Sequence, residues 1–460
     1  MRFESGGKSG IPFKAPSRVR PSWQDRALIL TSGLGYGHVR AAQAVEAALL
    51  QRQLDVRVVD LWSLINPGAV SIIHQTYLQL VQEHPALYER LYRLDERTWR
   101  QILESEDGPP PDVMEVLELI SQIASNSVAE SGGVQYATDR LLLSMLYTSL
   151  PYDRTSLAGN GVRARLALIK WSWLRMRKRL SALAASFAPD VIISTQMIPA
   201  AMISSLRGRQ SNVPHIGVLT DYGLHDFWRQ PGIDRYCIAH DSLVPSDDPD
   251  HARIATTGVP LMPAFAQPVS QREARLQLRL DPARKVVLIL GGGLGLSVDA
   301  IADRLLQGFT DTSLVVMPGR NANARDALSR HSLAAPGRVH VCNWTDRMDI
   351  YMSAADVVVG KPGGISVAEA LACGRPLFAT RSLGGQEGFN VRFLERHGVG
   401  ALVRDEEIAI RIEDVISQPQ ILSDMQQRAW CLGQRNGAAS VAELALDLLA
   451  SRRRTVRELQ

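Results

Sequence analysis

Two stretches of this chain begin in the same way, with an apolar strand, a glycine-rich turn and then a helix. They read LILTSGLGYGHVRAAQAVEAAL near the amino terminus and VLILGGGLGLSVDAIADRLL near the middle. A unit of this kind opens a doubly wound α/β domain, because the helix that follows the turn packs back on a parallel sheet. Its repetition predicts two such domains, and a length of 460 residues is sufficient for both.

Short apolar runs alternate with helical patterns through most of the chain, as is typical of parallel sheets covered by helices. We expect buried strands at 27–32, 56–62, 190–195, 215–221 and 235–239 in the first half, and at 286–292, 313–319, 338–343, 355–360 and 376–380 in the second. A connector punctuated by prolines, 256–268, marks the expected boundary between the two domains.

The same patterns predict how the chain is divided. Residues 1–24 are rich in Gly, Ser, Pro and Arg and lack an apolar segment, so we expect a flexible leader and no signal peptide. The first domain is expected over 25–260 and the second over 261–460, including a carboxy-terminal helix. Within the first, residues 95–185 have helical periodicity without a clear strand, which fits either a helical insertion over a cleft or a variable helical layer.

Composition excludes several classes of protein. The apolar fraction of 45% and charged fraction of 21% are ordinary for a globular protein, and the net charge of +4 gives no reason to expect a nucleic-acid partner. No apolar run reaches the ~20 residues that a membrane-spanning helix needs. The four cysteines are scattered without a CxxC pair, which indicates neither a zinc site nor a disulfide framework and fits a reducing cytoplasm.

One basic segment has two interpretations. Residues 170–180, KWSWLRMRKRL, interleave two tryptophans with five cations. A basic stretch with tryptophans is able to lie at an anionic membrane surface. The alternative is a helix with a solvated basic face and a packed aromatic side.

Three glycine turns follow strands and precede helices: Gly33–Gly37, Gly291–Gly295 and Gly363–Gly364. Backbone N–H groups and the helix dipole make such turns suitable for phosphate, although glycine also simply permits a tight turn. Neither G-x-G-x-x-G nor the P-loop pattern is present, which disfavours a nicotinamide enzyme or an ATPase. Two of the three glycine turns lie in the second half, so we expect a phosphorylated ligand there. No set of side chains has metal-ligand spacing, so we expect no metal, and we expect no cofactor.

Three side chains beside these turns are candidates for chemistry. His38 follows the first turn and is either a general base or a structural histidine. Arg320 follows a strand end and either binds a phosphate or lies on the surface. Glu369 completes Ser366-Val367-Ala368-Glu369, which fits a capping box; its carboxylate is also placed to accept the hydroxyls of a ribose. The residues alone leave these alternatives open.

In combination the motifs resemble a known family. KPGGISVAEALACGRPLFATRSLGGQEGFNVRFLERHGVG is similar to the nucleotide-binding signature of the GT-B glycosyltransferases related to monogalactosyldiacylglycerol synthase, processive diacylglycerol glucosyltransferase and MurG. SGLGYGHVRAAQAVEAAL resembles their first glycine loop with its histidine, and LTDYGLHDFWRQPGIDRYCIAHD resembles the diacylglycerol branch. The likeness extends from about residue 26 to 440. One departure is Tyr36, which stands where most relatives have glycine.

The resemblance implies two facing Rossmann-like domains with a cleft between them, the first accepting a lipid at the membrane and the second holding a UDP-sugar. It implies that Glu369 binds the ribose, that Met348 borders the uracil and that His38 is the catalytic base. The implied donor-binding residues are Gly291, Gly292, Gly293, Arg320, Met348, Lys361, Gly363, Gly364, Ser366, Glu369, Gln386, Glu387 and Asn390, of which the last three face the sugar. The implied acceptor-side residues are Gly35, Gly37, Asp221 and His225.

The function that follows is an inverting transfer of a hexose from a UDP-sugar to a hydroxyl of a membrane lipid, diacylglycerol or a glycosyl-diacylglycerol. Such an enzyme is expected in the cytoplasm, peripherally bound to the anionic inner face of the cell membrane. Three alternatives stay open: a UDP-N-acetylglucosamine-dependent transferase with another lipid-linked acceptor, a UDP-GlcNAc 2-epimerase-like enzyme, and a nucleotide-sugar sensor without catalysis.

Overall fold

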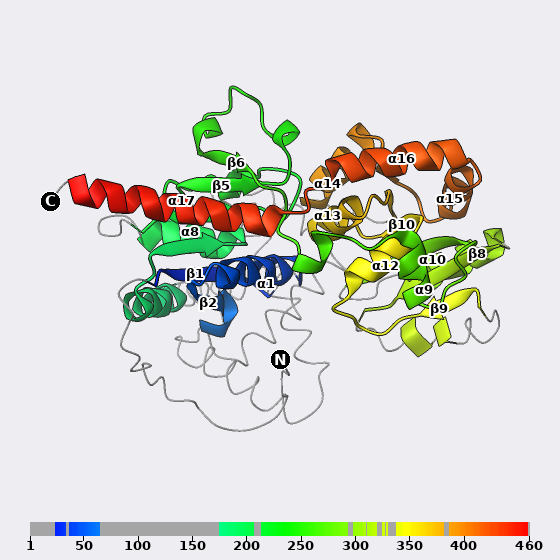
Figure 1. The fold of residues 1–460 in the computed structure, drawn as a ribbon, viewed down its shortest axis with the longest axis horizontal. Coiled ribbons are helices and arrows are strands. Elements are labelled where there is room, and N and C mark those ends of the chain that lie inside the picture. Colours follow the sequence, from blue (N-terminus) through cyan, green and yellow to red (C-terminus); the bar gives the residue numbers. More distant parts are fainter. Residues whose placement is uncertain are drawn as a thin grey trace, which may run out of the picture.

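The protein contains two parallel six-stranded sheets, each flanked by helices, in a computed structural model (Figure 1). The strands of the first half of the chain form one sheet and those of the second half form the other, as the two-domain α/β prediction requires. The residues that the structure describes are 24–33, 36–64, 174–206, 213–292, 298–309, 311–319, 324–326, 328–329, 337–380 and 386–458.

The first sheet has the strand order β2-β1-β3-β4-β5-β6. Chain order reverses beside β1, because β2 lies on one side of it and β3 on the other. In register, Ile29 of β1 lies between Val58 and Ile193. The bounds are β1 Arg26–Thr31, β2 Asp55–Asp60, β3 Val191–Ser194, β4 His215–Val218, β5 Arg235–Ile238 and β6 Ile254–Thr256, with helices α1 Tyr36–Gln51 and α8 Met197–Leu206.

The second sheet has the order β12-β11-β10-β7-β8-β9, that of a dinucleotide-binding fold, and its chain order reverses between β7 and β10. Ile289 of β7 lies between Val316 and Val359. The strands are β7 Lys285–Leu290, β8 Thr312–Met317, β9 Val339–Val341, β10 Val357–Gly360, β11 Leu377–Ala379 and β12 Gly400–Leu402. The helices are α9 Gln271–Gln277, α10 Val298–Gly308, α12 Met348–Ala354, α13 Gly364–Ala372, α14 Gln386–Arg396, α15 Ile408–Ile416 and α16 Pro419–Leu432.

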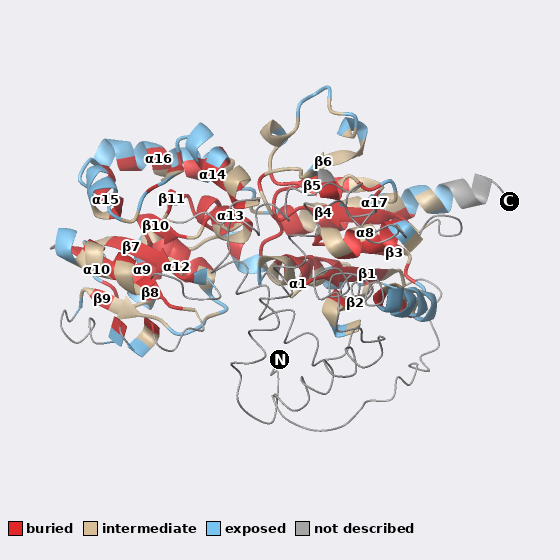
Figure 2. Cartoon of the chain, turned by 180° about the vertical axis from the view of Figure 1, so that it is seen from behind, coloured by how far each residue is buried: buried red, intermediate tan, exposed pale blue. Residues whose placement is uncertain are grey.

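The ten strands expected from the sequence are all present, which confirms the two-domain Rossmann-like fold. Two edge strands, β6 and β12, were not expected. Each has only three residues, and both are partly exposed, so neither forms the continuous apolar run by which the others are recognised. Figure 2 shows the buried strands at the centre of each domain and exposed surface on outer helices such as α15 and α16.

The last helix, α17 (Gly437–Glu458), leaves the second half of the chain and packs on the first sheet's layer beside α1 (Figure 1). Its buried residues Val441, Ala445 and Leu449 share an apolar cluster with Ile29 and Val45. Chain order groups this helix with the second domain, whereas in space it covers the first.

A helix over 174–187 contains the described part of the basic segment. Met176, Leu180 and Leu183 are buried against the first sheet, whereas Lys178 and Arg179 are exposed. This portion therefore has a packed apolar side and a solvated basic face. The tryptophans of the segment, the leader and most of 95–185 lie outside the described residues. No described helix has the length and apolarity needed to cross a membrane.

Candidate active site

The two sheets present the carboxyl ends of their central strands to each other. At the first, α1 begins after β1 and Thr195 follows β3; at the second, Gly292 follows β7 and Gly363 follows β10. Contacts between the domains join these ends: a Cβ at Gly364 would overlap the main-chain oxygen of Thr220. Points where chain order reverses are where open α/β sheets bind ligands, and here two of them meet.

His38 lies in the first turn of α1 and is held by two threonines. Its Nδ1 is 2.9 Å from the main-chain oxygen of Thr195 and 3.0 Å from Oγ1 of Thr220. Since a carbonyl oxygen only accepts, Nδ1 carries the proton and Nε2 keeps its lone pair. Burial lowers the pKa of His38, although the Asp221 carboxylate and the bond to Thr195 oppose the change. A neutral imidazole with a fixed tautomer is suited to take a proton through Nε2.

Glu369 lies in α13 at 7% exposure. Within the described part of the chain its carboxylate forms no hydrogen bond or ion pair. Burial raises the pKa of Glu369 to about 8; the charge of Arg40 opposes this rise and that of Asp349 adds to it. A buried carboxyl group without a partner is costly, and hydroxyl donors of a ligand would satisfy it.

The capping-box interpretation of Glu369 is wrong. Helix α13 begins at Gly364, with Gly363 as its N-cap and no side chain bonded to the cap. Ser366 is therefore the third residue of the helix and Glu369 lies in the second turn, so neither side chain is in the position that a capping box requires. The pattern S-x-x-E was present, but the double glycine before it starts the helix earlier.

The glycines of the second domain divide into open and covered positions. Among the described residues, a Cβ at Gly292, whose φ is +62°, or at Gly363 would meet no atom within 4 Å. Gly291 instead donates its N–H to the oxygen of Met317 at 2.9 Å. The open glycines Gly292 and Gly363 follow the paired strands β7 and β10. The backbone at both is therefore accessible to a ligand near the start of α13. On the other domain, Gly37 packs against Ile365.

Lys361 and Asp221 bring opposite charges to the same place. Lys361 Nζ is 2.5 Å from Glu387 Oε1 at the start of α14. Burial lowers the pKa of Lys361 to about 8, and the nearby Asp221 carboxylate opposes the change. Lys361 is thus positioned after β10 as a half-exposed cation whose charge is supported by its acidic neighbours.

Asn390 connects the two domains. It is fully buried, its Oδ1 accepts from the N–H of Tyr222 at 2.7 Å, and its Nδ2 donates to Asp221 at 2.9 Å and to the oxygen of Pro362 at 2.8 Å. Two of these three bonds, those to Tyr222 and Asp221, cross the domain interface, whereas the sequence analysis expects Asn390 to face the donor sugar. Gln386 and Glu387 open the same helix α14, half-buried and buried respectively.

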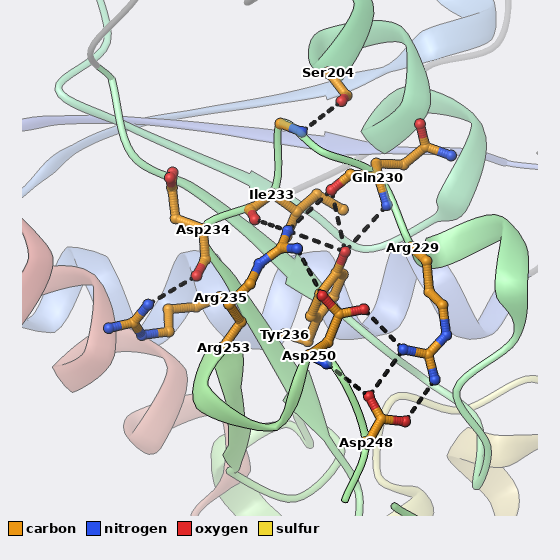
Figure 3. Close-up of polar contacts among 11 residues, drawn as sticks. Ser204, Arg229, Gln230, Ile233, Asp234, Arg235, Tyr236, Asp248, Asp250 and Arg253 are labelled. Carbon is orange, nitrogen blue, oxygen red and sulfur yellow. Dashed lines mark hydrogen bonds and ion pairs between the residues drawn. The ribbon is translucent and has the colours of Figure 1, made fainter.

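The segment that carries Asp221 and His225 is fixed by an ionic network in the first domain (Figure 3). Arg229 binds Asp248 through both terminal nitrogens, at 2.9 and 2.7 Å, and also Asp250 at 2.7 Å. This pairing lowers the pKa of Asp248. His225 itself accepts the N–H of Phe227 through Nδ1 at 3.1 Å, so its ring orientation is set locally.

A second set of contacts borders the segment that starts α12. Met348 is the first residue of α12 and packs partly against the core. The preceding Trp344 meets Tyr36 of α1 edge-on, with ring centroids 4.8 Å apart. Arg40 Nη1 lies 3.2 Å from Asp346 Oδ1. Both pairs join the first domain to the second.

Sequence reasoning did not identify Thr195, Thr220 or Arg40. Each lies just after the carboxyl end of a strand or in the first two turns of α1, which is the signal that would have identified them once strand order was known. Gly35, Gly293 and Arg320 lie outside the described residues. In the part of the chain that the structure describes, no three His, Cys, Asp or Glu side chains are grouped to hold a metal ion.

Comparison with family models gives two matches. Residues 162–261 match the model described as monogalactosyldiacylglycerol (MGDG) synthase, and residues 286–445 match the glycosyltransferase family 28 C-terminal domain. The second range contains the glycine turns after β7 and β10, and the first contains Asp221 and His225.

Curated relatives carry related names. The chain is 28% identical over 294 residues to the processive diacylglycerol beta-glucosyltransferase of Bacillus licheniformis, covering 61% of this chain and 76% of that one. It is 24% identical over 436 residues to the protein of that name from Bacillus thuringiensis, covering 92% and 93%.

Among solved structures, MurG of Acinetobacter baumannii shares the fold with a TM-score of 0.55 and 16% identity, covering 92% of this chain and all of that one. A glycosyltransferase of kitacinnamycin gives 0.54, with 15% identity and coverage of 93% and 99%. Taken with the two facing sheets, these matches show that the chain belongs to the GT-B glycosyltransferases related to monogalactosyldiacylglycerol synthase, processive diacylglycerol glucosyltransferase and MurG.

Proposed function

We propose that the protein transfers a hexose from a UDP-sugar to a hydroxyl of a membrane lipid, diacylglycerol or a glycosyl-diacylglycerol, with inversion at the anomeric carbon. The observation that carries the donor part of this proposal is Glu369, a buried carboxyl group that has no bonding partner among the described residues, in the helix that begins after the open Gly363. Its hydrogen-bonding needs match the two hydroxyls of a ribose. The names of the curated relatives support the lipid part.

In the proposed reaction, Nε2 of His38 removes the proton from the acceptor hydroxyl. The oxygen then forms a bond to the anomeric carbon while the bond from that carbon to the UDP oxygen breaks, and UDP departs with the electron pair. Nδ1 stays bonded to Thr195 throughout, so the imidazolium that forms is stabilised by the same contact and by the Asp221 carboxylate.

The departing diphosphate needs positive charge and N–H donors. We assign this role to the start of α13 over Gly363, to the turn after β7 and to Lys361. Arg320 is proposed to assist. In the same proposal, Gln386 and Glu387 face the donor sugar, and Met348 borders the uracil.

Lipid access is proposed at the first domain, on the cytoplasmic face of the membrane. The exposed basic face of helix 174–187, with Arg175, Lys178 and Arg179, is suited to anionic headgroups. Reversing Lys178 and Arg179 to Glu should reduce binding to vesicles that contain phosphatidylglycerol. Binding equal to that of the unchanged protein would remove this surface from the proposal.

The deciding experiment is incubation of the protein with each of several UDP-sugars and a lipid extract, with UDP release and new glycolipid read by mass spectrometry. We expect one UDP-sugar to give both products. UDP release without a new lipid would contradict lipid transfer, and conversion of the UDP-sugar without an acceptor would indicate an epimerase.

Two variants separate the proposed roles. His38→Ala should lower the rate by about a hundredfold or more, because general-base catalysis contributes ~10²–10⁴, while UDP affinity stays near normal. Glu369→Ala should weaken UDP binding by roughly tenfold, measured by isothermal titration calorimetry, because the hydrogen bonds between its carboxyl group and the ribose are lost. A full rate in the first, or unchanged affinity in the second, would contradict the assignment concerned.

A further inference from the structure

Arg40 is a first-domain cation that reaches the second domain. Its side chain is 18% exposed, and Nη1 lies 3.2 Å from Asp346 Oδ1 and 3.5 Å from Gln43 Oε1. The Tyr36–Trp344 ring contact, with centroids 4.8 Å apart, joins the preceding turn of α1 to the same segment of the second domain. The position of Arg40 between the domains is therefore determined by two independent contacts.

The guanidinium of Arg40 has bonding capacity left over. It carries five N–H donors, and among the described residues only Nη1 is engaged. Its acidic partner, Asp346, is 82% exposed, so the pair adds little stability of its own. A largely buried arginine with unused donors is suited to an anion that offers two acceptor oxygens, as a carboxylate or a phosphate does.

The position of Arg40 relative to Glu369 indicates which ligand the guanidinium would bind. The charge of Arg40 opposes the effect of burial on the pKa of Glu369, in agreement with the contact between the helices that carry the two residues. Helices α1 and α13, which carry the two residues, are in contact, with Gly37 against Ile365. A nucleotide whose ribose lies on Glu369 would therefore lie at the contact between α13 and the amino-terminal part of α1.

We propose that Arg40 is a donor-binding residue supplied by the acceptor-side domain, whose free guanidinium N–H groups bind phosphate oxygens of the nucleoside diphosphate held at Glu369. The inference rests on the proposed function and extends it. Because the ligand is then held by one residue from each domain, nucleotide binding stabilises the closed arrangement in which His38 faces the second domain.

The experiment compares UDP with uridine, which has the same base and ribose but no phosphate. Affinities are measured by isothermal titration calorimetry for UDP and by competition for uridine, on the full chain. Arg40→Gln should weaken UDP binding roughly tenfold to a hundredfold, as expected for lost charge-assisted bonds. Uridine affinity should change less than twofold. Arg40→Lys, which keeps the charge but not the planar fork, should give an intermediate loss for UDP.

The matched control is Arg52→Gln, just beyond the other end of α1, where Arg52 pairs with Glu443 at 2.5 Å. It should leave both affinities unchanged, and thermal melting establishes that all variants are folded. Equal losses for UDP and uridine in Arg40→Gln, or no loss for UDP, would overturn the inference while the proposed function stands. Failure of the unchanged protein to bind UDP would overturn both.

Discussion

The carboxyl group of Glu369 is held at 7% exposure with its pKa raised to about 8, from an ordinary value of 4.5. Between these two pH values the folded protein keeps a proton that the unfolded chain releases. The contribution of this group to stability is therefore complete below pH 4.5 and is lost as the pH rises toward 8. A residue that costs stability near neutral pH is expected to serve a ligand.

We predict that Glu369→Gln is more stable than the unchanged protein near neutral pH. Glutamine cannot ionise, so the advantage should be near zero below about pH 4 and reach on the order of 3 kcal/mol by pH 7. The free energy of unfolding, from urea titrations at a series of pH values, measures it.

The control for this prediction is Glu413→Gln, an exposed glutamate of α15. Its stability should follow that of the unchanged protein at every pH. Parallel curves for Glu369→Gln as well would mean that Glu369 does not titrate in this range.

At this scale the sequence identified His38 and Glu369 as candidates, because each follows a glycine turn at a strand end. It did not identify what holds His38. Thr195 and Thr220 are 157 and 182 residues away along the chain. Their proximity results from the order β1-β3-β4 in the sheet, which no local pattern encodes.

Helix α13 shows how a short pattern misleads at the scale of an element. The sequence contains S-x-x-E, yet the helix begins two residues before the serine because Gly363 adopts the extended N-cap conformation. The ten expected strands were predicted correctly, since each is a short apolar run that differs from the helical patterns on either side of it. Only the three-residue edge strands β6 and β12 were not predicted from the sequence.

Two substitutions in α13 should have opposite outcomes. Ser366→Ala should change the free energy of unfolding by less than about 0.5 kcal/mol, because Ser366 does not cap the helix. Gly364→Ala should destabilise the protein by about 1–3 kcal/mol, because the added Cβ overlaps the Thr220 oxygen of the other domain. Thermal melting distinguishes the two, and a loss of about 1 kcal/mol in Ser366→Ala would restore the capping role.

At the scale of the molecule, the two domains are joined by buried polar and apolar contacts. Asn390 bonds to both, and the core of the second domain includes Tyr222 from the first. The sequence predicted two domains facing each other through its resemblance to a family. Which side chains meet between them depends on how two separately formed sheets dock, and this could not be predicted from periodicity.

The return of α17 to the first domain brings two chain segments together. A Cβ at Gly437 would lie 2.5 Å from the oxygen of Val259, in the connector between the domains. We predict that Gly437→Ala lowers the free energy of unfolding by about 1–3 kcal/mol, because backbone has to move. Gly388→Ala is the control, since only the flexible end of Arg392 is near. Equal melting temperatures for the two variants would contradict the prediction.

These neighbouring segments have a mechanical consequence. The chain passes between the domains twice, once on the way out near Gly258 and once on the way back near Gln434, and at Gly258, with φ at +83°, the two passages touch. Two domains that are connected at one such point are able to rotate about it, but they do not separate there. Any opening that admits a sugar nucleotide is therefore smallest beside this pivot and widest at the rim farthest from it.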